Sequence, residues 1–504
     1  MNDIILTFPL FSIISCFLGA VLCSFTKKKF AFVTSLVVCC IVFVLSLFVF
    51  IYTYTENQSF IYTMGHFGPN EDGIRICNEI RFGPLEGFLS TFFSFVLFLC
   101  IIGGKIFQNR DIQPQKQNLY YVMMCLILVS NISLIYTNDI FTGYVFIEIS
   151  TLISCGCLMV KEKGPTILST IRYMIFNLVG SGLFLIGIVT LYNLTGYLSI
   201  ENIAMALKQM ETLSFPCLVS FTLIVIGLSI KAGLFPFHFW MPDAYGCATP
   251  TSSSILSGIV TKGYILLLIK VIFRMFTYEV IIQTNLLDIL FVLGVLGMII
   301  GSINAIHQTS VDRMIAFSSA AQIGYIFMGI GLGEKYALLA SLFHILTHAV
   351  TKPLLFISSE HLSVVANDSK KFRNLRGSGR VDIISGIGFS VGALSMVGIP
   401  LFAGFISKWI FVNAALFDST AHWMQVIALL ALLISTVLNA VYFVRTMITI
   451  YLPVPKESIT KMHLSKYNGM YLVGIFGLIA LNLFLGISSD WISDILLKGI
   501  QLFI

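Results

Sequence analysis

Charged residues are scarce in this sequence. Of its 504 residues only 11% are Asp, Glu, Lys or Arg, whereas 57% are hydrophobic. Soluble globular domains carry about 25% charged residues, so the composition excludes a soluble enzyme or binding module. Apolar runs of about 20 residues, the length that crosses a hydrocarbon core of ~30 Å, recur from one end of the chain to the other. The sequence therefore predicts an all-α integral membrane protein.

Familiar catalytic and cofactor motifs are also missing. There is no Rossmann glycine motif, no Walker motif and no cysteine set spaced for an iron–sulfur cluster. Most of the 11 cysteines fall inside predicted helices, and the close pairs Cys39-Cys40 and Cys155-x-Cys157 lack the C-x₂-C spacing of zinc sites. Such cysteines pack as small apolar residues. We expect no catalytic centre, cofactor or metal in this chain, and any oxidoreductase activity belongs to its partners.

About fourteen transmembrane helices are predicted from the apolar runs. The opening MNDIILTF lacks the basic region and cleavage site of a signal peptide, so we expect the first helix to be retained. The longest polar gap, 55–86, is too short for a domain and is expected to form an ordered outer loop or hairpin. The predicted helices lie near residues 4–25, 30–54, 87–109, 118–137, 140–160, 165–193, 215–237, 251–273, 281–305, 313–333, 336–362, 383–412, 422–450 and 468–488.

The Lys and Arg residues are shared unevenly between the two sides of the membrane. Of the 30, eighteen fall on the loops or helix ends of one side, including the stretch 369–380. Seven fall on the other side, and these are Arg75, Arg81, Lys208, Lys270, Arg274, Lys335 and Lys498. By the positive-inside rule the richer side is cytoplasmic, so both termini are expected on the outer face of the cell membrane. The net charge of +6 then reflects topology and the contact of 369–380 with anionic lipid, and it indicates no nucleic-acid partner. Five cations remain inside predicted spans: Arg172, Lys231, Lys262, Lys352 and Lys408.

Charges inside a span need a reason, because each costs at least ~2.5–3.5 kcal/mol at a helix centre. Glu148 is the one carboxylate well inside a predicted helix, and a buried carboxylate either takes up a proton or finds a cation. Lys231 is the natural candidate for that cation. Such a pair can be charged or neutral according to the state of each partner, so it forms a switchable proton site.

A second group of titratable residues recurs every four positions. His344, His348 and Lys352 therefore share one helical face, which favours a hydrated proton path. A zinc site is the alternative for the two histidines, but no nearby acidic residue completes it and lysine is a poor ligand. Pro353 directly follows Lys352 and disfavours helical geometry there. Lys262 lies among Ser, Gly and Thr residues, which permit close packing and leave room for water.

Two predicted helices contain interruptions. Pro236 and Pro242 are expected to break the helix that carries Lys231, and Gly398-Ile399-Pro400 precedes Lys408. The surrounding stretches, LSIKAGLFPF and LSMVGIPLFAGF, are themselves similar. Interrupted helices in corresponding positions of two halves indicate an internal repeat with a transport site at the breaks, where freed carbonyls line a polar cavity.

Several segments together resemble a known family. It comprises the antiporter-like proton-translocating subunits of respiratory complex I, of energy-converting membrane hydrogenases and of Mrp-type multisubunit Na⁺/H⁺ antiporters. The similar segments cover about residues 119–450 and read NDIFTGYVFIEI, KAGLFPFHFWMPDAY, TKGYILLLIK, DRMIAFSSAAQIGYIFMGIGLG, SLFHILTHAVTKPLLF and GIPLFAGFISKW. Lys262 in GIVTKG is similar to the Mrp and hydrogenase branch. The absence of a long carboxy-terminal lateral helix disfavours the largest complex I member.

This resemblance implies two inverted five-helix repeats, each with a discontinuous helix. The chain then divides into helices one to three with the outer loop (1–117), a first repeat (118–280), a second repeat (281–450) and a C-terminal helix (451–504). The implied proton path consists of Glu148 and Lys231 as a coupling pair, Lys262 as a central switch, His344, His348 and Lys352 as a connection, and Lys408 as the terminal site. Asp139, Arg172 and His238 are expected to be supporting polar residues.

The sequence thus favours a proton-translocating subunit of a multisubunit complex, coupled to redox chemistry or to Na⁺/H⁺ exchange. Its expected partners are other membrane subunits, the bilayer, protons and, in an antiporter, Na⁺. The alternative is a stand-alone secondary transporter of a small solute, which also has broken helices and a midplane site. Titratable groups spread singly over many helices suit proton conduction better than a shaped solute pocket. An inert scaffold would not keep four lysines in lipid at such cost.

Overall fold

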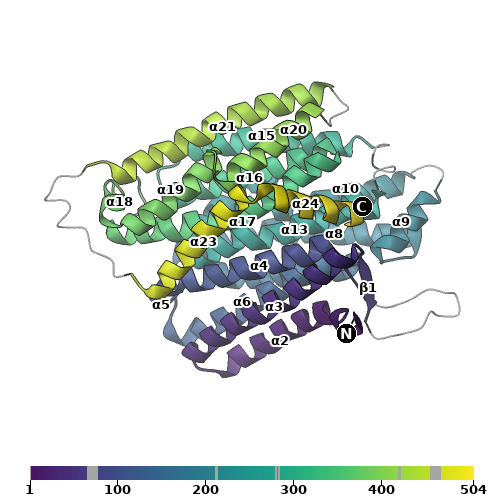
Figure 1. The fold of residues 1–504 in the computed structure, drawn as a ribbon, viewed down its shortest axis with the longest axis horizontal. Helices are drawn as coiled ribbons and strands as arrows, with labels where there is room; N and C mark the ends of the chain where they lie inside the picture. The colour runs from purple at the N-terminus through teal and green to yellow at the C-terminus, as the bar shows by residue number, and fades with distance from the viewer. Residues whose placement is uncertain are drawn as a thin grey trace.

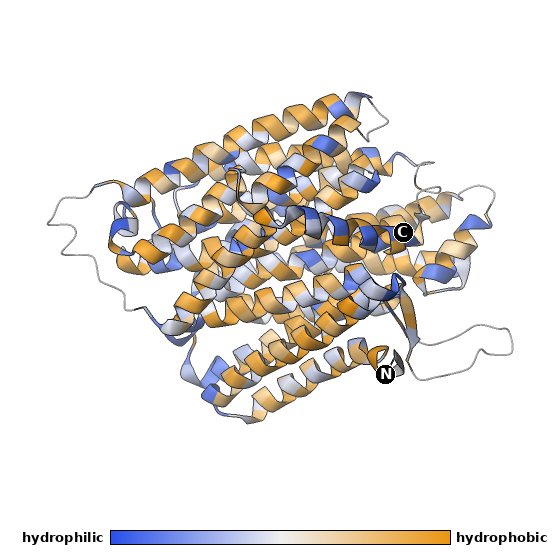
Figure 2. Ribbon diagram, in the orientation of Figure 1, coloured by the Kyte–Doolittle hydropathy of each residue, from blue (hydrophilic) through white to orange (hydrophobic). Residues whose placement is uncertain are grey.

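The computed structural model describes residues 2–64, 78–210, 214–277, 281, 284–417, 422–453 and 467–503. Its long helices run side by side between two ends (Figure 1). Hydrophobic residues cover the lengths of the helices, and hydrophilic residues gather near the ends (Figure 2). Within the described residues 13 helices are long and apolar enough to cross a membrane, and two shorter apolar helices accompany them. The predicted multi-pass helical membrane fold is confirmed.

The two ends of the helix bundle differ. One end holds the 369–380 connection, which includes α18 (Ser378–Val381), and is called the basic end below. The other holds both chain termini and is called the terminal end (Figure 1). Both termini therefore lie on the same side of the bundle, as the even number of predicted spans requires.

The first three spans pack against one another at the start of the chain. Their helices and the short ones beside them are α1 (Asn2–Ile5), α2 (Phe8–Phe25), α3 (Lys28–Glu56), α4 (Pro84–Gly103), α5 (Lys105–Asp111) and η1 (Pro114–Lys116). The predicted hairpin is present between α3 and α4, where β1 (Phe60–Thr63) pairs antiparallel with β2 (Glu79–Phe82). Residues 65–77 of that loop lie outside the described residues, as do Lys456, Lys461 and Lys466 of the basic side.

The next spans contain the first interrupted helix. The elements are α6 (Gln117–Tyr136), α7 (Ile140–Met159), α8 (Gly164–Thr195), α9 (Ile200–Lys208), α10 (Phe215–Ala232), η2 (Phe237–Phe239), α11 (Trp240–Cys247), α12 (Pro250–Ile255), η3 (Leu256–Val260), α13 (Thr261–Lys270) and η4 (Val271–Met275). The turns η3 and η4 are π-helical, which locally widens the helix made by α12 and α13.

The remaining spans contain the second interrupted helix. They are α15 (Leu286–Ile306), α16 (Val311–Leu332), α17 (Lys335–Val365), α19 (Ile383–Val397), α20 (Ala403–Phe417), α21 (His422–Tyr451) and α23 (Gly469–Ile487), followed by α24 (Ser489–Phe503). The single C-terminal helix expected after residue 450 is thus joined by another. α24 alternates polar and apolar residues at helical spacing, so a search for continuous apolar runs passes over it.

Both predicted breaks are present, and the helical segments before them, α10 and α19, end in the same way. Gly233 and Gly398 adopt positive φ angles of 77° and 92°. At each break the amide after the glycine donates to the carbonyl five residues earlier, from Leu234 to Ser229 and from Ile399 to Leu394. This is the hydrogen-bond pattern of a helix that ends on a left-handed glycine. The local signal for interruption therefore includes these glycines as well as the prolines.

Candidate functional site

Three helical segments at the centre of the bundle, α12 to η4, α16 and α17, are buried along their length. Other helices separate them from the bilayer, so polar side chains on them face protein. All but one of the membrane-depth cations predicted from the sequence lie on these segments or on the two interrupted helices, and Arg172 is the exception. A charge in this position avoids lipid but still needs partners.

Glu148 and Lys231 form the predicted ion pair. Nζ of Lys231 lies 3.0 Å from Oε1 of Glu148 and donates to the hydroxyl of Thr151 at 2.9 Å. Ser181 donates to the same carboxylate oxygen. The side chain of Lys231 is fully buried in the last turn before the Gly233 break, whereas that of Glu148 is 27% exposed. The carboxylate therefore faces outward and the ammonium faces inward. The row, as used below, means the titratable residues Glu148, Lys231, Lys262, Lys352, His348, His344 and Lys408.

Lys262 is fully buried in the centre of the molecule. Its ammonium donates to the carbonyl of Ser257 at 2.7 Å and to the hydroxyl of Thr261 at 3.1 Å, and it has no carboxylate partner within the described chain. The π-helical turn η3 contains Ser257 and brings this carbonyl within reach of a side chain five residues later. Lys262 is thus held by neutral oxygens alone, and such an arrangement accommodates both a charged and a neutral amine.

A hydroxyl-bearing side chain lies between these two lysines. The hydroxyl of Tyr264, on the same helix as Lys262, donates to Ser150 at 3.1 Å. Ser150 neighbours Thr151, which binds Lys231, and the ring of Tyr264 has its centroid 5.9 Å from Nζ of Lys231. Tyr264 therefore connects the ion pair to the helix of Lys262.

Lys352 occupies the far end of the stripe on α17. It donates to the carbonyl of Ile315 at 3.1 Å and to the hydroxyl of Ser318 at 2.8 Å, both on α16. The expectation that Pro353 disturbs helical geometry at Lys352 is wrong, because α17 continues through Pro353 as one helix. The ring of Pro353 packs beside Gly258, where the missing side chain leaves space for it.

His344 and His348 lie between Lys352 and the second break. Both are buried, and neither ring nitrogen of His348 has a hydrogen-bond partner among the described residues. Nδ1 of His344 hydrogen-bonds the hydroxyl of Ser407 at 3.0 Å, while its Nε2 has no such partner in the described chain. Buried polar atoms without protein partners are the usual binding sites of ordered water.

Lys408 follows Ser407 and lies at the second break. Its ammonium donates to the carbonyls of Met396 at 3.0 Å and Val397 at 2.8 Å, the last residues of α19. These are carbonyls that the end of a helix leaves without amide partners. At the first break the indole of Trp240 takes the corresponding role by donating to Ile230 at 3.3 Å. Carbonyls that the second break leaves without amide partners thus bind the ammonium of Lys408.

Several residues of α16 that line the row were not predicted from the sequence. Ser318 binds Lys352, Ser319 hydrogen-bonds Ser257 at 3.0 Å, and the ring of Tyr325 stacks on His344 at 5.3 Å. Gln322, which lies between Ser319 and Tyr325 along α16, is fully buried. Neither its amide nitrogen nor its amide oxygen has a partner among the described residues. Polar residues at 318, 319, 322 and 325 have helical spacing, and that period could have revealed them.

Two cations expected among the residues of the terminal side are in fact buried. Lys270 donates to the carbonyls of Leu134, Ile135 and Thr137 at the end of α6, and Arg274 donates to the side chain of Asn138 at 2.8 Å. A cation at this place donates hydrogen bonds to carbonyls that have no amide partner, and its charge is attracted by the negative end of the helix dipole. Lys270 therefore acts as a cap for α6.

The three supporting residues have different surroundings. Asp139 caps α7 by accepting from the amide of Thr142 at 2.6 Å, and burial raises its pKa. His238 is buried beside the first break, in contact with the ring of Phe239 at 4.5 Å. Arg172 was expected among the buried cations, but its side chain is 54% exposed and it pairs with Asp243. The structure thus places Arg172 apart from the row.

A network of charged residues connects α16 and α17 at the basic end. Lys370 bridges the buried carboxylates of Asp312 and Glu360, and Arg110 also binds Glu360. Burial alone lowers the pKa of Lys370, but the two carboxylates outweigh burial and raise it. Among the described residues no three His, Cys, Asp or Glu side chains are grouped as metal ligands.

A family model described as NADH:quinone oxidoreductase/Mrp antiporter, TM matches residues 137–438, which include every residue of the row. The chain belongs to this family. NADH-quinone oxidoreductase subunit N of Desulforudis audaxviator (strain MP104C) is 31% identical over 376 residues, which cover 74% of this chain and 73% of that protein. A Na(+)/H(+) antiporter subunit of Alkalihalophilus pseudofirmus is 23% identical over 403 residues, 79% of each chain.

Chains of two solved membrane complexes share this fold. A chain of the membrane-bound sulfane sulfur reductase, an archaeal respiratory membrane complex, matches 99% of this chain and 97% of its own with a TM-score of 0.85 and 23% identity. A chain of the Mrp complex from Dietzia sp. DQ12-45-1b matches 99% of both chains with a TM-score of 0.85 and 19% identity. This protein is therefore an antiporter-like membrane subunit of this class of complexes, with other membrane subunits as partners.

Proposed function

We propose that this chain conducts protons across the membrane along the row from Glu148 and Lys231, through Lys262, to Lys352, His348, His344 and Lys408. The observation that carries the proposal is the continuity of contacts along the row. Tyr264 connects the first pair to the helix of Lys262, and α16 contacts Lys262's helix, Lys352 and His344. Each group binds and releases protons, and the intervening hydroxyls accept and donate hydrogen bonds.

Charge repulsion supplies the direction of each transfer. Two ammonium groups on neighbouring buried helices repel strongly, because the protein interior screens charge weakly. A proton that arrives at Lys262 therefore favours the loss of a proton from the next group. Withdrawal of Lys231 from Glu148 would remove the carboxylate that stabilises its charge, so movement of this pair changes the occupancy of the whole row.

Water completes the route where protein contacts end. His348, Gln322 and Nε2 of His344 lack partners among the described residues, and all are buried within the row. Single waters bound to these atoms would connect groups that do not touch. At the far end Lys408 lies against freed carbonyls at the second break, which suits it to release protons toward the terminal end.

The proposal extends to the position of the chain in the membrane and to its partners. We place the chain in the cell membrane with both termini outside, so the basic end faces the cytoplasm. We assign the two inverted repeats to residues 118–280 and 281–450. Partner subunits would supply the driving force, either redox chemistry or Na⁺/H⁺ exchange, because this chain contributes only the proton path.

The proposal is tested by removing either member of the ion pair in the intact complex. We expect Lys231→Ala and Glu148→Ala to abolish coupled proton transport, measured as pH change inside vesicles, while the complex still assembles. Lys371→Ala, at an exposed lysine of the basic end, serves as the control and should retain full transport. Full transport in both variants of the ion pair would refute the proposed route.

A further inference from the structure

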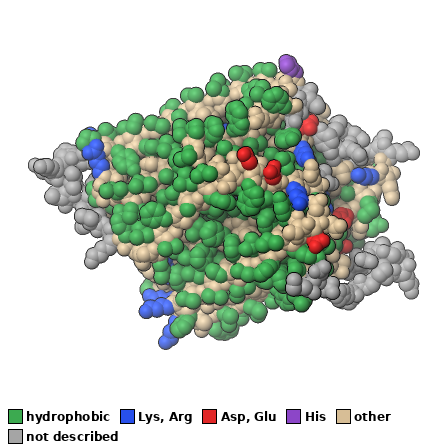
Figure 3. Space-filling model, in the orientation of Figure 1, with side chains coloured by type: hydrophobic (Ala, Val, Ile, Leu, Met, Phe, Trp, Pro, Cys, Tyr) green, Lys and Arg blue, Asp and Glu red, His purple; other side chains and the backbone are tan. Residues whose placement is uncertain are grey.

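The first half of α24 presents acidic side chains that the described residues leave uncovered. Asp490 and Asp494 are one helical turn apart and exposed. Neither makes an ion pair or hydrogen bond with any residue that the structure describes. Figure 3 shows two acidic side chains among hydrophobic ones in the region where Figure 1 shows α24, with Lys or Arg side chains to their right.

These carboxylates lie within the depth of the membrane and not at its surface. Gly486, in the last turn of α23, packs so closely on the interrupted helix that a Cβ there would clash with the carbonyl oxygen of Leu401. Gly499 of α24 packs on Leu85 at the terminal end of α4. An α-helix rises about 1.5 Å per residue, so Asp490 lies about 14 Å from Gly499 along the helix axis, in the direction of the bilayer centre.

A carboxylate that faces hydrocarbon at this depth is costly. In membrane proteins such a carboxylate usually faces the bundle interior or pairs with a cation. The apolar residues of α24 already face the bundle, so the acidic face cannot turn inward without exposing them. The remaining solution is a partner that covers the acidic face.

Asp490 lines a groove on the surface of the molecule. The groove has a volume of about 740 Å³ and lies between α20, the start of α17 and α24. Its walls include Tyr336, Phe405, Trp409, Asn413 and Ser493. Aromatic walls with a few polar groups beside a charged rim are typical of protein interfaces.

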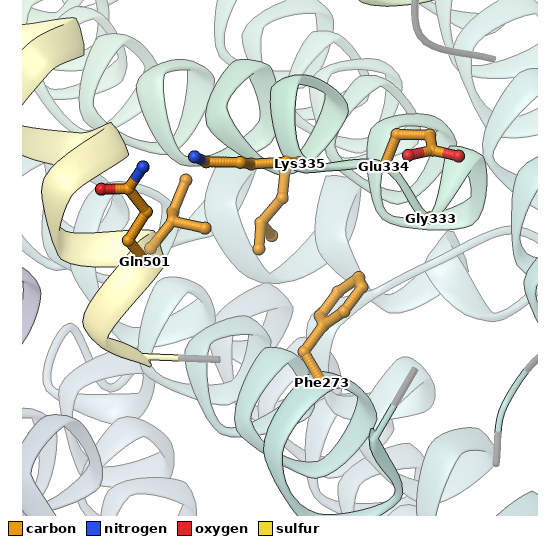
Figure 4. A pocket seen from close by; sticks show the side chains of 7 residues that line it. Phe273, Gly333, Glu334, Lys335 and Gln501 are labelled. Carbon is orange, nitrogen blue, oxygen red and sulfur yellow. The ribbon is translucent and has the colours of Figure 1, made fainter. Parts of the chain in front are cut away.

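The second half of α24 differs, because the chain itself supplies its partners. Lys498 donates to the carbonyl of Tyr54 at 2.8 Å, and Arg81 donates to that of Leu502 at 2.8 Å. Lys335 and Gln501 extend toward each other across a cavity of about 380 Å³ (Figure 4). Among the described residues, cations thus reach the C-terminal half of α24, and none pairs with the acidic residues of its first half.

We propose that the acidic face of α24, defined by Asp490 and Asp494 and the adjoining groove, binds a transmembrane helix of another subunit that presents lysine or arginine. A lipid headgroup is a poorer occupant, because headgroups lie at the interface and not at this depth. A second copy of the same face is also a poor match, because it would oppose acidic residues to acidic residues. The inference concerns assembly and does not depend on proton conduction.

The first test is the composition of the purified complex. We expect Asp490→Lys/Asp494→Lys to reduce the amount of one membrane subunit that co-purifies by about tenfold or more, since the variant places like charges opposite each other. Asp490→Asn/Asp494→Asn should give a smaller loss of the same subunit. Glu56→Lys, at an exposed acidic residue at the end of α3, is the matched control and should leave the composition unchanged.

The second test identifies the occupant directly, and it also distinguishes lost binding from misfolding. A photocrosslinker placed at Ser493 in the intact complex should join this chain to a membrane helix of another subunit near a Lys or Arg residue. Crosslinks only to lipid, or only to a second copy of this chain, would overturn the proposal. So would an unchanged composition in the double lysine variant.

Discussion

At the scale of single residues, Gln322 combines a cost to stability with a proposed role in transport. A buried amide with no protein partner is destabilising, whereas leucine at the same position would fill similar volume without a polar group. We predict that Gln322→Leu raises the stability of the protein by about 1–3 kcal/mol. The same change should slow proton transport by about tenfold, the effect of losing ~1.4 kcal/mol of water-mediated stabilisation.

The two measurements are thermal unfolding of the purified complex and proton transport in vesicles. Gln117→Leu is the control, because Gln117 is also buried with an unpartnered amide oxygen but lies at the basic end, away from the row. It should leave transport unchanged. Unchanged transport in Gln322→Leu as well would show that Gln322 does not position water on the route.

The residues of the row were predictable in proportion to how unusual they are in a membrane helix. Glu148, Lys231, Lys262 and Lys408 could be recognised because a charge at that depth must be functional or paired. The serines of α16 could not be recognised individually, since a hydroxyl in a transmembrane helix often bonds to its own backbone. Their contacts with the row become visible only when α16 packs against α17, and that packing belongs to the tertiary structure.

Arg172 and Lys270 show the limit of reasoning from depth along the sequence. Arg172 lies nine residues into α8, yet its long side chain reaches Asp243 near the basic end. Lys270 ends a predicted helix, yet it turns inward to cap α6. Sequence position sets the depth of a Cα atom, whereas side-chain direction and neighbouring helix ends decide where the charge lies.

At the scale of elements, the break at Gly398 positions Lys408. Gly398 has a φ of 92°, and a Cβ there would lie 3.0 Å from Cδ of Lys408. Alanine would therefore strain the backbone and displace the lysine from the carbonyls of α19. We predict that Gly398→Ala costs about 1–2 kcal/mol of stability and strongly reduces transport.

Thermal unfolding and vesicle transport measure both effects. The matched control is Gly182→Ala in α8, where no heavy atom lies within 4 Å of the new Cβ. Alanine should stabilise that helix by about 0.5–1 kcal/mol and leave transport intact. If Gly398→Ala behaves like Gly182→Ala, then the left-handed glycine does not hold Lys408 in place.

Helices were predictable where hydrophobicity alone determines them. The long apolar spans and both breaks follow from run length, glycine and proline. α9 and α24 were missed because they are short and amphipathic, so no continuous apolar run marks them. Helix α17 passes through Pro353 without a break, because the packing of its buried faces against neighbouring helices outweighs the loss of one backbone hydrogen bond.

At the scale of the whole molecule, the orientation in the membrane decides the direction of the proposed path. The basic end carries the 369–380 connection, and the terminal end carries α9 and both termini (Figure 1). If the basic end is cytoplasmic, the freed carbonyls and Lys408 serve release to the outside. The opposite orientation would make the same residues an intake site for protons from outside.

Site-directed labelling distinguishes these orientations. We introduce Arg373→Cys at the basic end and Gln209→Cys beside α9, both at exposed positions, and treat intact cells with a membrane-impermeant maleimide. The positive-inside bias predicts labelling of Gln209→Cys only, with Arg373→Cys labelled after the membrane is permeabilised. The unmodified chain controls for native cysteines such as the exposed Cys40. Labelling of Arg373→Cys in intact cells would reverse the orientation and, with it, the direction assigned to Lys408.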